Sequence, residues 1–307
     1  MKNPDDYTER INRAIDYVKR HLSQPLKLDD VANVANFSSH HFHRVFRALV
    51  GETLHAFVKR TRLERALSLL SHQPDQTLTE VALACGFASS SDFSRSFRAH
   101  FGVPPRTFDV EHYRNSRREQ MQRQLVGEGE AERLARLPRG ENPDGFEVRL
   151  RELPARRVAY IRVSDPYSGD GVSIAARDLL AWAKARGLET GQWLGYQWEN
   201  PEITELSKCH YDIGLVIPAS ATVEGVSETT FSAMTVAEIE LVGTVELELR
   251  ALDWFYTSWL PRSGFVPDHH PGFEAFRGWP FEHGSEHFEL RIHIAVRDAA
   301  LGIPDAE

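Results

Sequence analysis

The segment Ala84–Pro105, ACGFASSSDFSRSFRAHFGVPP, combines a Gly-Phe turn, a serine run, regularly spaced phenylalanines and a closing Gly-Val-Pro-Pro. Phenylalanines four positions apart lie on one face of a helix, so Phe93 and Phe97 are expected to point into a core. Gly86 is a residue that tolerates a left-handed turn just before that helix. The segment therefore predicts a tight turn followed by a helix whose outer face carries serines and arginines.

The same segment has an earlier copy in the chain. The pattern of residues 28–37 recurs at 78–87, and that of residues 42–51 recurs at 93–102. Asn36, the other residue type that tolerates a left-handed turn, stands where the second copy has Gly86. Two copies of one helix-turn-helix unit are therefore predicted. Periodic apolar residues predict two further helices, at about 7–22 and 54–70, that complete an all-α domain.

The second helix of each unit, at 38–49 and 89–101, has the composition of a DNA-reading helix. Arginine pairs bidentately with guanine in the major groove, and such a helix lies in that groove. The candidate DNA contacts are the outward-facing polar residues: His40, His43, Arg44, Arg47, Ser90, Ser91, Ser94, Arg95 and Arg98. The alternative is a pair of solvated amphipathic helices without a partner.

The charge distribution favours the DNA-reading interpretation. Residues 1–118 contain 18 Lys and Arg against 13 Asp and Glu, whereas residues 119–307 contain 18 against 31. A basic first part is attracted to a polyanion, and an acidic second part is not. The two parts are therefore expected to have different partners.

The opening segment and its copy resemble the AraC/XylS family of bacterial transcription regulators over about residues 7–113. The resemblance implies that one chain places two recognition helices into adjacent major-groove segments of double-stranded DNA. Recruitment of RNA polymerase is a further hypothesis for how such a regulator acts. His40 stands where well-studied relatives often carry tryptophan. Asp92 brings an acid near the groove, where it either accepts a hydrogen bond from cytosine or caps the helix. The operator sequence therefore does not transfer from the family.

The domain boundaries follow from changes in composition. Residues 1–115 are assigned to the DNA-binding domain, residues 116–144 to a polar linker rich in Pro and Gly, and residues 145–307 to a second domain. From Phe146 the hydrophobic period becomes alternating, which is typical of strands, with one helix at about 172–186.

The second domain also contains a repeat. Val158-Ala159 recurs as Val236-Ala237, and Tyr196 aligns with Glu274 at the same offset of 78. A strand-helix-strand-strand unit is therefore predicted twice, giving an α+β domain with internal two-fold symmetry. The seam between two such halves is a natural place for a small-molecule site.

Four strings in this domain, LGYQWENPEI, CHYDIGLVI, SWLPRSGF and HHPGFEAF, resemble the GyrI-like effector-binding domain over about residues 145–297. An AraC-type domain followed by this one is similar to the Rob-like regulators. The resemblance implies multidrug sensing, with a bulky aromatic or cationic effector. A carboxylate among aromatic rings suits a lipophilic cation. The candidate ligand residues are Glu274, Tyr196, Trp198, Phe276 and Trp279.

Two alternatives to ligand sensing remain for Glu274. Some GyrI-like proteins resemble hydrolases that use a glutamate with a tyrosine, although this chain has Phe276 where a tyrosine is common. The phenols left for that role are listed here: Tyr160, Tyr167, Tyr196, Tyr211 and Tyr256. The other alternative is a surface glutamate on an edge strand. Ligand sensing is preferred, so the protein is predicted not to be an enzyme.

No cofactor, metal or membrane is expected. The chain has no nucleotide-binding or serine-hydrolase motif, and its histidine pairs lack a common face. Its two cysteines, Cys85 and Cys209, are far apart and outside any CxxC motif, as in a reduced compartment. Without a long apolar run or an apolar leader, the protein is predicted to be cytoplasmic.

Overall fold

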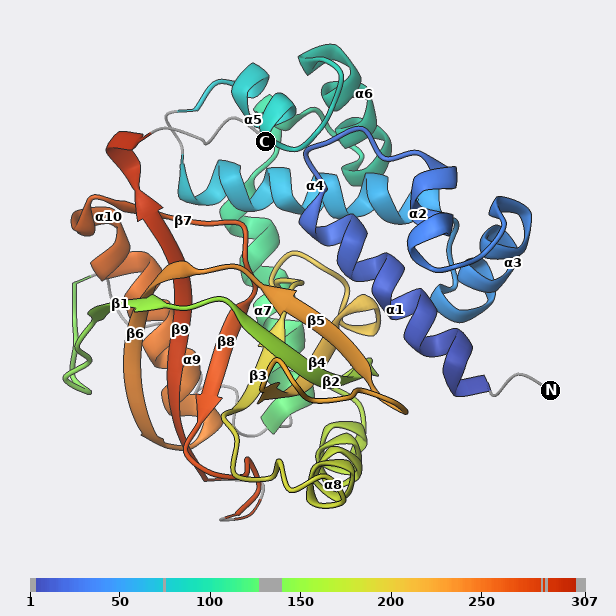
Figure 1. The fold of residues 1–307 in the computed structure, drawn as a ribbon. Helices are drawn as coiled ribbons and strands as arrows, with labels where there is room; N and C mark the ends of the chain where they lie inside the picture. Colours follow the sequence, from blue (N-terminus) through green and yellow to red (C-terminus); the bar gives the residue numbers. More distant parts are fainter. Residues whose placement is uncertain (1–3, 74–75, 127–139, 283, 285–286, 302–307) are drawn as a thin grey trace. The chain divides into compact units, whose positions relative to one another are not determined.

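The computed structural model describes residues 4–73, 76–126, 140–282, 284 and 287–301. Contacts within the chain divide it after Arg114 into two compact units, which are described separately below (Figure 1). The first unit is helical and the second is built on a sheet.

The helices of the first unit lie within three residues of their predicted positions. Their bounds are α1 (Pro4–Arg20), α2 (Leu28–Val34), α3 (Ser39–Val50), α4 (Leu54–His72), α5 (Leu78–Ala84) and α6 (Ser90–Phe101), followed by a 3-10 turn at Pro105–Thr107 and α7 from Val110. The pairs α2–α3 and α5–α6 are the two predicted helix-turn-helix units.

The turn between the two helices of each unit has the predicted geometry. Asn36 has a φ of 53° and Gly86 a φ of 80°, so both are left-handed. Each second helix then begins at a serine cap. The Ser38 hydroxyl accepts from the backbone of the first turn of α3, and the Ser89 hydroxyl does so in α6. The repeat in the sequence is therefore a repeat in backbone conformation.

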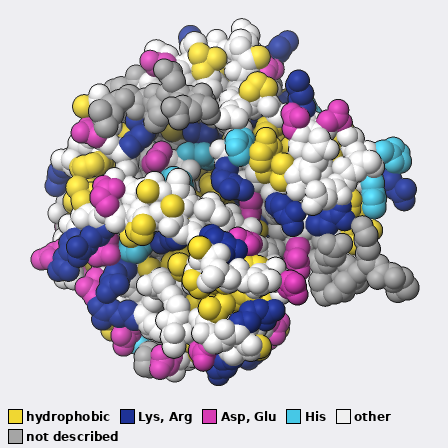
Figure 2. All heavy atoms as spheres, in the orientation of Figure 1, with side chains coloured by type: hydrophobic (Ala, Val, Ile, Leu, Met, Phe, Trp, Pro, Cys, Tyr) yellow, Lys and Arg dark blue, Asp and Glu magenta, His cyan; other side chains and the backbone are white. Residues whose placement is uncertain are grey.

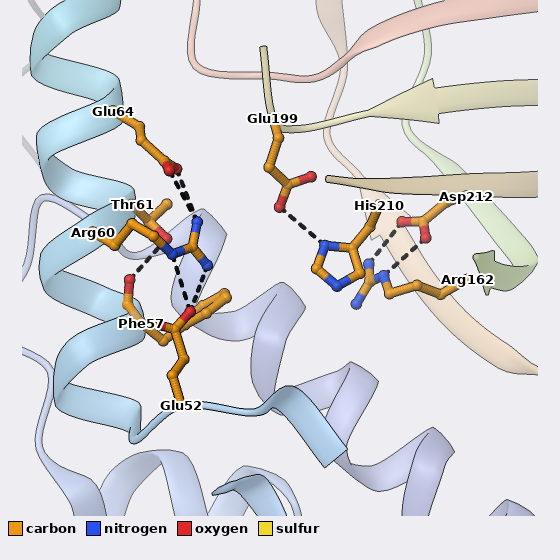
Figure 3. Close-up of polar contacts among 9 residues, drawn as sticks. All are labelled: Glu52, Phe57, Arg60, Thr61, Glu64, Arg162, Glu199, His210 and Asp212. Atoms are coloured by element: carbon orange, nitrogen blue, oxygen red, sulfur yellow. Dashed lines mark hydrogen bonds and ion pairs between the residues drawn. The ribbon is translucent and has the colours of Figure 1, made fainter. Parts of the chain in front are cut away.

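The phenylalanines predicted to face inward form the core. Phe42, Phe46, Phe93 and Phe97 are all 0% exposed. A buried arginine supports the same core from α4, since Arg60 is held by carboxylates on both sides. Its Nη2 donates to Glu52 over 2.6 Å and its Nη1 to Glu64 over 3.0 Å (Figure 3).

Arg62 of α4 holds the segment that follows α1. Its Nε donates to the Leu22 carbonyl oxygen over 3.0 Å, and its Nη2 donates to that of Gln24 over 2.7 Å. Gly86 approaches the same place so closely that a Cβ on it would lie 2.5 Å from the Leu22 oxygen. Gly86 is therefore required both for its left-handed φ and for this close approach.

The second unit contains one sheet with antiparallel pairing. Within the described residues its strands are β1 (Arg149–Leu153), β2 (Arg156–Ser164), β3 (Trp193–Gln197), β4 (His210–Ile217), β5 (Ser227–Phe231), β6 (Met234–Gly243), β7 (Phe265–Pro267), β8 (Gly272–Phe276) and β9 (Phe288–Asp298). The order across the sheet is β1-β6-β9-β8-β3-β4-β2-β5, and β7 pairs with β9. The helical elements are α8 (Gly171–Lys184), α9 (Val245–Trp254), a π-helical turn (Phe255–Trp259) and α10 (Leu260–Ser263), with 3-10 turns at Leu206–Lys208 and Ala299–Leu301.

The predicted duplication is present, as β2-α8-β3-β4 and β6-α9-β8-β9. The halves meet where β3 pairs with β8, and there Gly195 lies opposite Glu274. Gly195 and Glu274 also pair with Ile213 and Ile292 in their own halves, so they occupy equivalent positions. The pseudo-two-fold axis therefore passes through the Gly195–Glu274 pair, at an offset of 79 rather than the predicted 78.

The two faces of the sheet differ in what covers them. The first face packs against α8 and α9 through residues such as Trp193 and Ile213. The second face carries a separate buried cluster that includes Tyr160, Tyr196 and Phe273. Because side chains alternate along a strand, neighbouring residues belong to different faces.

The second face ends in a buried ion pair on β2 and β4. Arg162 donates to both carboxylate oxygens of Asp212, with its Nε over 2.8 Å and its Nη2 over 2.7 Å (Figure 3). The two side chains are 4% and 2% exposed. The pairing with Asp212 offsets the cost of burying the Arg162 guanidinium away from water.

Part of the predicted linker at 116–144 is ordered helix. Helix α7 continues to Val126, and within the second unit its Arg118 and Met121 are buried. Arg118 donates to Asp253 and, over 3.0 Å, to Glu202. Residues 127–139 of the predicted linker lie outside the described residues.

Replacing Gly86 with alanine should destabilise the first unit more than the same change at Gly102. Both glycines have a left-handed φ, which costs alanine about 1–2 kcal/mol, but a Cβ at Gly102 meets nothing within 4 Å. At Gly86 the clash with the Leu22 oxygen adds to that cost. Urea unfolding of the full chain, followed by circular dichroism, compares the variants. Equal losses would show that the close approach is not required.

Candidate functional site

The polar residues predicted to contact DNA are accessible on the two second helices. On α3, His40, His43, Arg44 and Arg47 are exposed. Figure 2 shows histidine and basic side chains together at the surface of this helix, whose basic residues are arginines. A helix held by buried phenylalanines, with basic residues on its outer side, has the form needed to enter a major groove.

On α6 the exposed face is shorter and more polar. Ser91, Arg95 and Arg98 are exposed, and Ser90 and Ser94 are partly exposed. None of the nine candidate DNA residues is buried. The structure thus keeps each candidate available, without showing which base each one contacts.

Asp92 does not cap α6, because the Ser89 hydroxyl accepts from the Asp92 backbone nitrogen over 3.1 Å. The Asp92 carboxylate instead lies 3.8 Å from the Arg95 guanidinium, whose side chain is 80% exposed. An exposed pair of this kind contributes little to stability. The Asp92 carboxylate does, however, reduce the positive charge that the Arg95 side chain presents at the surface.

In the second unit, Glu274 lies on the first face of the sheet within a group of polar side chains. The Tyr211 hydroxyl donates to its carboxylate Oε2 over 2.5 Å. Electrostatic interactions also connect Glu274 with Glu248 on α9 and with Tyr167. Tyr167 in turn donates to the Gln197 side-chain oxygen over 3.1 Å. These five residues, Glu274, Tyr211, Glu248, Tyr167 and Gln197, are called the Glu274 cluster below.

Gly195 makes the Tyr211–Glu274 hydrogen bond possible. A Cβ at Gly195 would lie 1.7 Å from the Tyr211 oxygen and 2.8 Å from Glu274 Oε2. The phenol therefore occupies the space that a side chain at this position would fill. Because Gly195 of β3 has no side chain, the Tyr211 side chain of β4 can cross β3 and reach Glu274 on β8.

Burial changes the acidity of the cluster. It raises the pKa of Glu274 to about 7, and the Tyr211 hydrogen bond opposes this rise only in part. Burial, followed by the charge of Glu274, raises the pKa of Glu248 well above its usual range. The same two causes, in the same order, raise the pKa of Tyr211. Near neutral pH, Glu274 is therefore close to its midpoint.

The structure does not bring the five predicted ligand residues together. Tyr196 and Trp198 belong to the second face, opposite the face of Glu274. Phe276 shares the face of Glu274 but is only 6% exposed and packs in the core. Trp279 packs partly buried at the edge of that core. The expectation of one site containing all five residues is therefore wrong, because Tyr196 was aligned with Glu274 one residue out of register.

Only weak signals in the sequence indicate the true neighbours of Glu274. Tyr211 was one of five candidate phenols, and nothing in a single sequence singled it out. Glu248 and Gln197 were not identified at all. The available signal was Gly195, since a glycine inside a strand indicates close approach by another group.

Two further searches of the described residues gave negative results. No group of three or more His, Cys, Asp or Glu in the described part of the chain is arranged to hold a metal ion. No described helix is both long enough and apolar enough to cross a bilayer.

The geometry defines a two-part protein, with paired helix-turn-helix units followed by a domain built around a buried carboxyl cluster. Comparison with known families agrees with this description. Residues 31–109 match the family described as "Helix-turn-helix domain", and residues 146–297 match "GyrI-like small molecule binding domain". The chain belongs to the AraC family of transcription regulators and carries a GyrI-like domain. The predicted family and fold class are confirmed.

Similar proteins match the first unit. The probable transcription factor PqrA of Proteus vulgaris is 34% identical over 86 residues, covering 28% of this chain and 70% of that protein. The probable transcriptional regulator LumQ of Photobacterium leiognathi is 33% identical, covering 32% of this chain and 40% of that protein. The chain covers only 35% of another relative, the regulator YbfP of Bacillus subtilis. A solved AraC-type regulator from Chromobacterium violaceum is 30% identical, with a TM-score of 0.31, and covers 32% of this chain and 88% of that one.

Replacing Arg95 with alanine should weaken binding to a preferred duplex by about 1–3 kcal/mol, with the loss concentrated at one base pair. The side chain is largely exposed, so the unfolding midpoint should not change. Fluorescence anisotropy on duplexes selected from a random pool measures this. Arg106→Ala, an exposed arginine outside α3 and α6, is the matched control. An equal loss on every sequence would make Arg95 a phosphate contact.

Replacing Gly195 with alanine should break the Tyr211–Glu274 hydrogen bond, because the new methyl group overlaps the phenol oxygen. Gly272→Ala is the control in the neighbouring strand, where a Cβ meets nothing within 4 Å. A lost Tyr211 bond should raise the Glu274 pKa further, since that bond favours the ionised carboxylate. Infrared titration of the carboxyl band, with Glu274→Gln for assignment, measures it. An unchanged midpoint in Gly195→Ala would contradict the described geometry.

Proposed function

We propose that this protein is a ligand-responsive transcription regulator. The first unit binds double-stranded DNA through α3 and α6, and the second binds a bulky aromatic cation at the Glu274 cluster. RNA polymerase is the proposed downstream partner. The observation that supports ligand binding most strongly is the Glu274 carboxyl, whose pKa is raised by burial to about 7 and which has no cationic side chain among its described partners.

A cation would relieve the electrostatic cost of this arrangement. Ionising Glu274 places a negative charge in a buried region next to a second carboxyl, Glu248. An opposite charge within about 4–6 Å favours the ionised form of a carboxyl. The aromatic faces of Tyr211 and Tyr167 add cation–π attraction of about 0.5–2 kcal/mol per contact. Charge and ring together favour a flat organic cation over a neutral compound.

Hydrolysis is the second candidate function, and the Tyr211–Glu274 hydrogen bond is the observation that favours it. A carboxyl with a pKa near 7 suits a general base, and an adjacent phenol suits a proton donor. Ligand sensing ranks first because similar proteins are named as transcription regulators. Turnover of an aromatic epoxide by the full chain, abolished in Glu274→Gln, would reverse this ranking.

Binding of 1-methylquinolinium should strengthen as pH rises from 5.5 to about 7 and then level off. Below the pKa of Glu274 the carboxyl is protonated, so affinity should fall roughly tenfold for each pH unit. Isothermal titration calorimetry on the full chain measures this. The neutral 1-methylnaphthalene has nearly the same shape and should show no such dependence.

Glu274→Gln is the deciding variant in that experiment. It should weaken quinolinium binding and remove its pH dependence, while leaving binding of 1-methylnaphthalene nearly unchanged. Similar losses for the two compounds would eliminate the counter-ion role of Glu274.

A further inference from the structure

Arg156 places a charged guanidinium in the aromatic cluster on the second face of the sheet. It is the first residue of β2, and its guanidinium carbon lies 4.4 Å from the ring centre of Phe273 and 5.9 Å from that of Phe231. The Tyr196 ring lies 5.3 Å from Phe231 and 5.7 Å from Phe273. Rings from β3, β5 and β8 therefore surround one cation.

No carboxylate of the described chain pairs with this cation. The Nε and Nη2 atoms of Arg156 are buried, and neither has a hydrogen-bond acceptor among the described residues. Burial lowers the pKa of Arg156 to about 10, and the Tyr196 phenol opposes this only in part. The guanidinium therefore stays charged at neutral pH. Buried charged donors without acceptors are costly and rare, so they require an explanation.

In two other arginines of the same domain, the Nε and Nη2 atoms both donate to a carboxylate. Arg162 uses Nε and Nη2 to hold both oxygens of Asp212. Arg250 uses the same two atoms to hold both oxygens of Asp144, each over 2.8 Å. The side-on fork of Nε and Nη2 matches a carboxylate in geometry. In Arg156 this fork faces aromatic rings instead of a protein acid.

Two histidines lie in the surroundings of Arg156, each beside an acid. His293 lies directly across the β8–β9 pair from Phe273, and it interacts electrostatically with Arg156, as does His270. His293 bonds through Nε2 to Glu238 over 3.1 Å, and its buried Nδ1 has no partner among the described residues. Each of the two nearby acids is thus engaged by a histidine, Glu238 by His293 and Asp268 by His270, whose Nε2 lies 3.9 Å from the Asp268 carboxylate.

We infer that Arg156 is the anion-binding group of a second ligand site, on the face of the sheet opposite Glu274. The site takes a carboxylate joined to an apolar aromatic body, because the guanidinium fork matches a carboxylate and lies within the aromatic cluster of Phe231 and Phe273, which are 2% and 1% exposed. Arg156 as a whole is partly exposed, so a ligand can approach it. Strand β8 serves both sites, since Phe273 faces one and its neighbour Glu274 faces the other.

The test uses 1-naphthoate and its neutral counterpart 1-naphthamide, titrated calorimetrically into the full chain at pH 7.5. Naphthoate should bind, and Arg156→Met should weaken its binding at least tenfold while changing naphthamide binding less than twofold. Arg157→Met is the matched control. It removes the adjacent guanidinium, which points to the other side of β2 and bonds Glu228 over 2.7 Å.

Arg156→Lys covers the case in which the methionine variant does not fold. Lysine keeps the charge but not the side-on fork, so naphthoate binding should still weaken severalfold. A guanidinium that only packs against the rings would leave naphthoate binding unchanged in both variants.

The two proposed sites are distinguished by competition. Saturating 1-methylquinolinium should leave naphthoate binding intact, and Glu274→Gln should affect quinolinium only. Failure of quinolinium to bind would refute the cation site and leave the anion site standing. The anion site is refuted if naphthoate does not bind at millimolar concentration, if Arg156→Met weakens both naphthalene compounds equally, or if quinolinium displaces naphthoate.

Discussion

The pairing of Gly195 with Glu274 is the constraint on which the effector domain depends. It joins the two halves of the sheet at the pseudo-two-fold axis, where each residue is the symmetry equivalent of the other. One half supplies a glycine and the other a glutamate, so the two halves share a backbone symmetry but differ in the side chain at the axis. The absent side chain at Gly195 makes room for Tyr211, and the hydrogen bond from that phenol positions Glu274.

The first unit was largely predictable because its signals are local. A left-handed residue, a serine cap and phenylalanines four apart all lie within about twenty positions of one another, and two copies confirm each pattern. Asn36 and Gly86 adopt left-handed φ values as their residue types predict. The candidate DNA residues are accessible for the same reason, since the buried face of a short helix fixes its exposed face.

The ligand site was less predictable because it depends on strand register. Aligning Tyr196 with Glu274 gave an offset of 78, whereas the strand pairing gives 79. A slip of one residue moves a side chain to the other face of a sheet. Tyr196 and Trp198 were therefore assigned to the wrong side of the strand. The partners Tyr211 and Glu248 come from β4 and α9, and no spacing along the chain relates them to β8.

Helix α9 connects the proposed effector site at Glu274 with α7. A ligand changes the behaviour of a distant part only if it interacts differently with two arrangements of the protein. Within the second unit, α9 carries Glu248, which interacts with Glu274, and also Asp253, which holds Arg118 of α7. A cation bound at the proposed site would change the charge near Glu248 of α9, while the buried ion pair with Arg118 holds Asp253 at the other end of the helix. Removing one partner from a buried pair costs about 3–5 kcal/mol, so α7 is expected to follow α9 rather than separate from it. Helix α7 is thereby held by α9, the helix whose Glu248 interacts with Glu274.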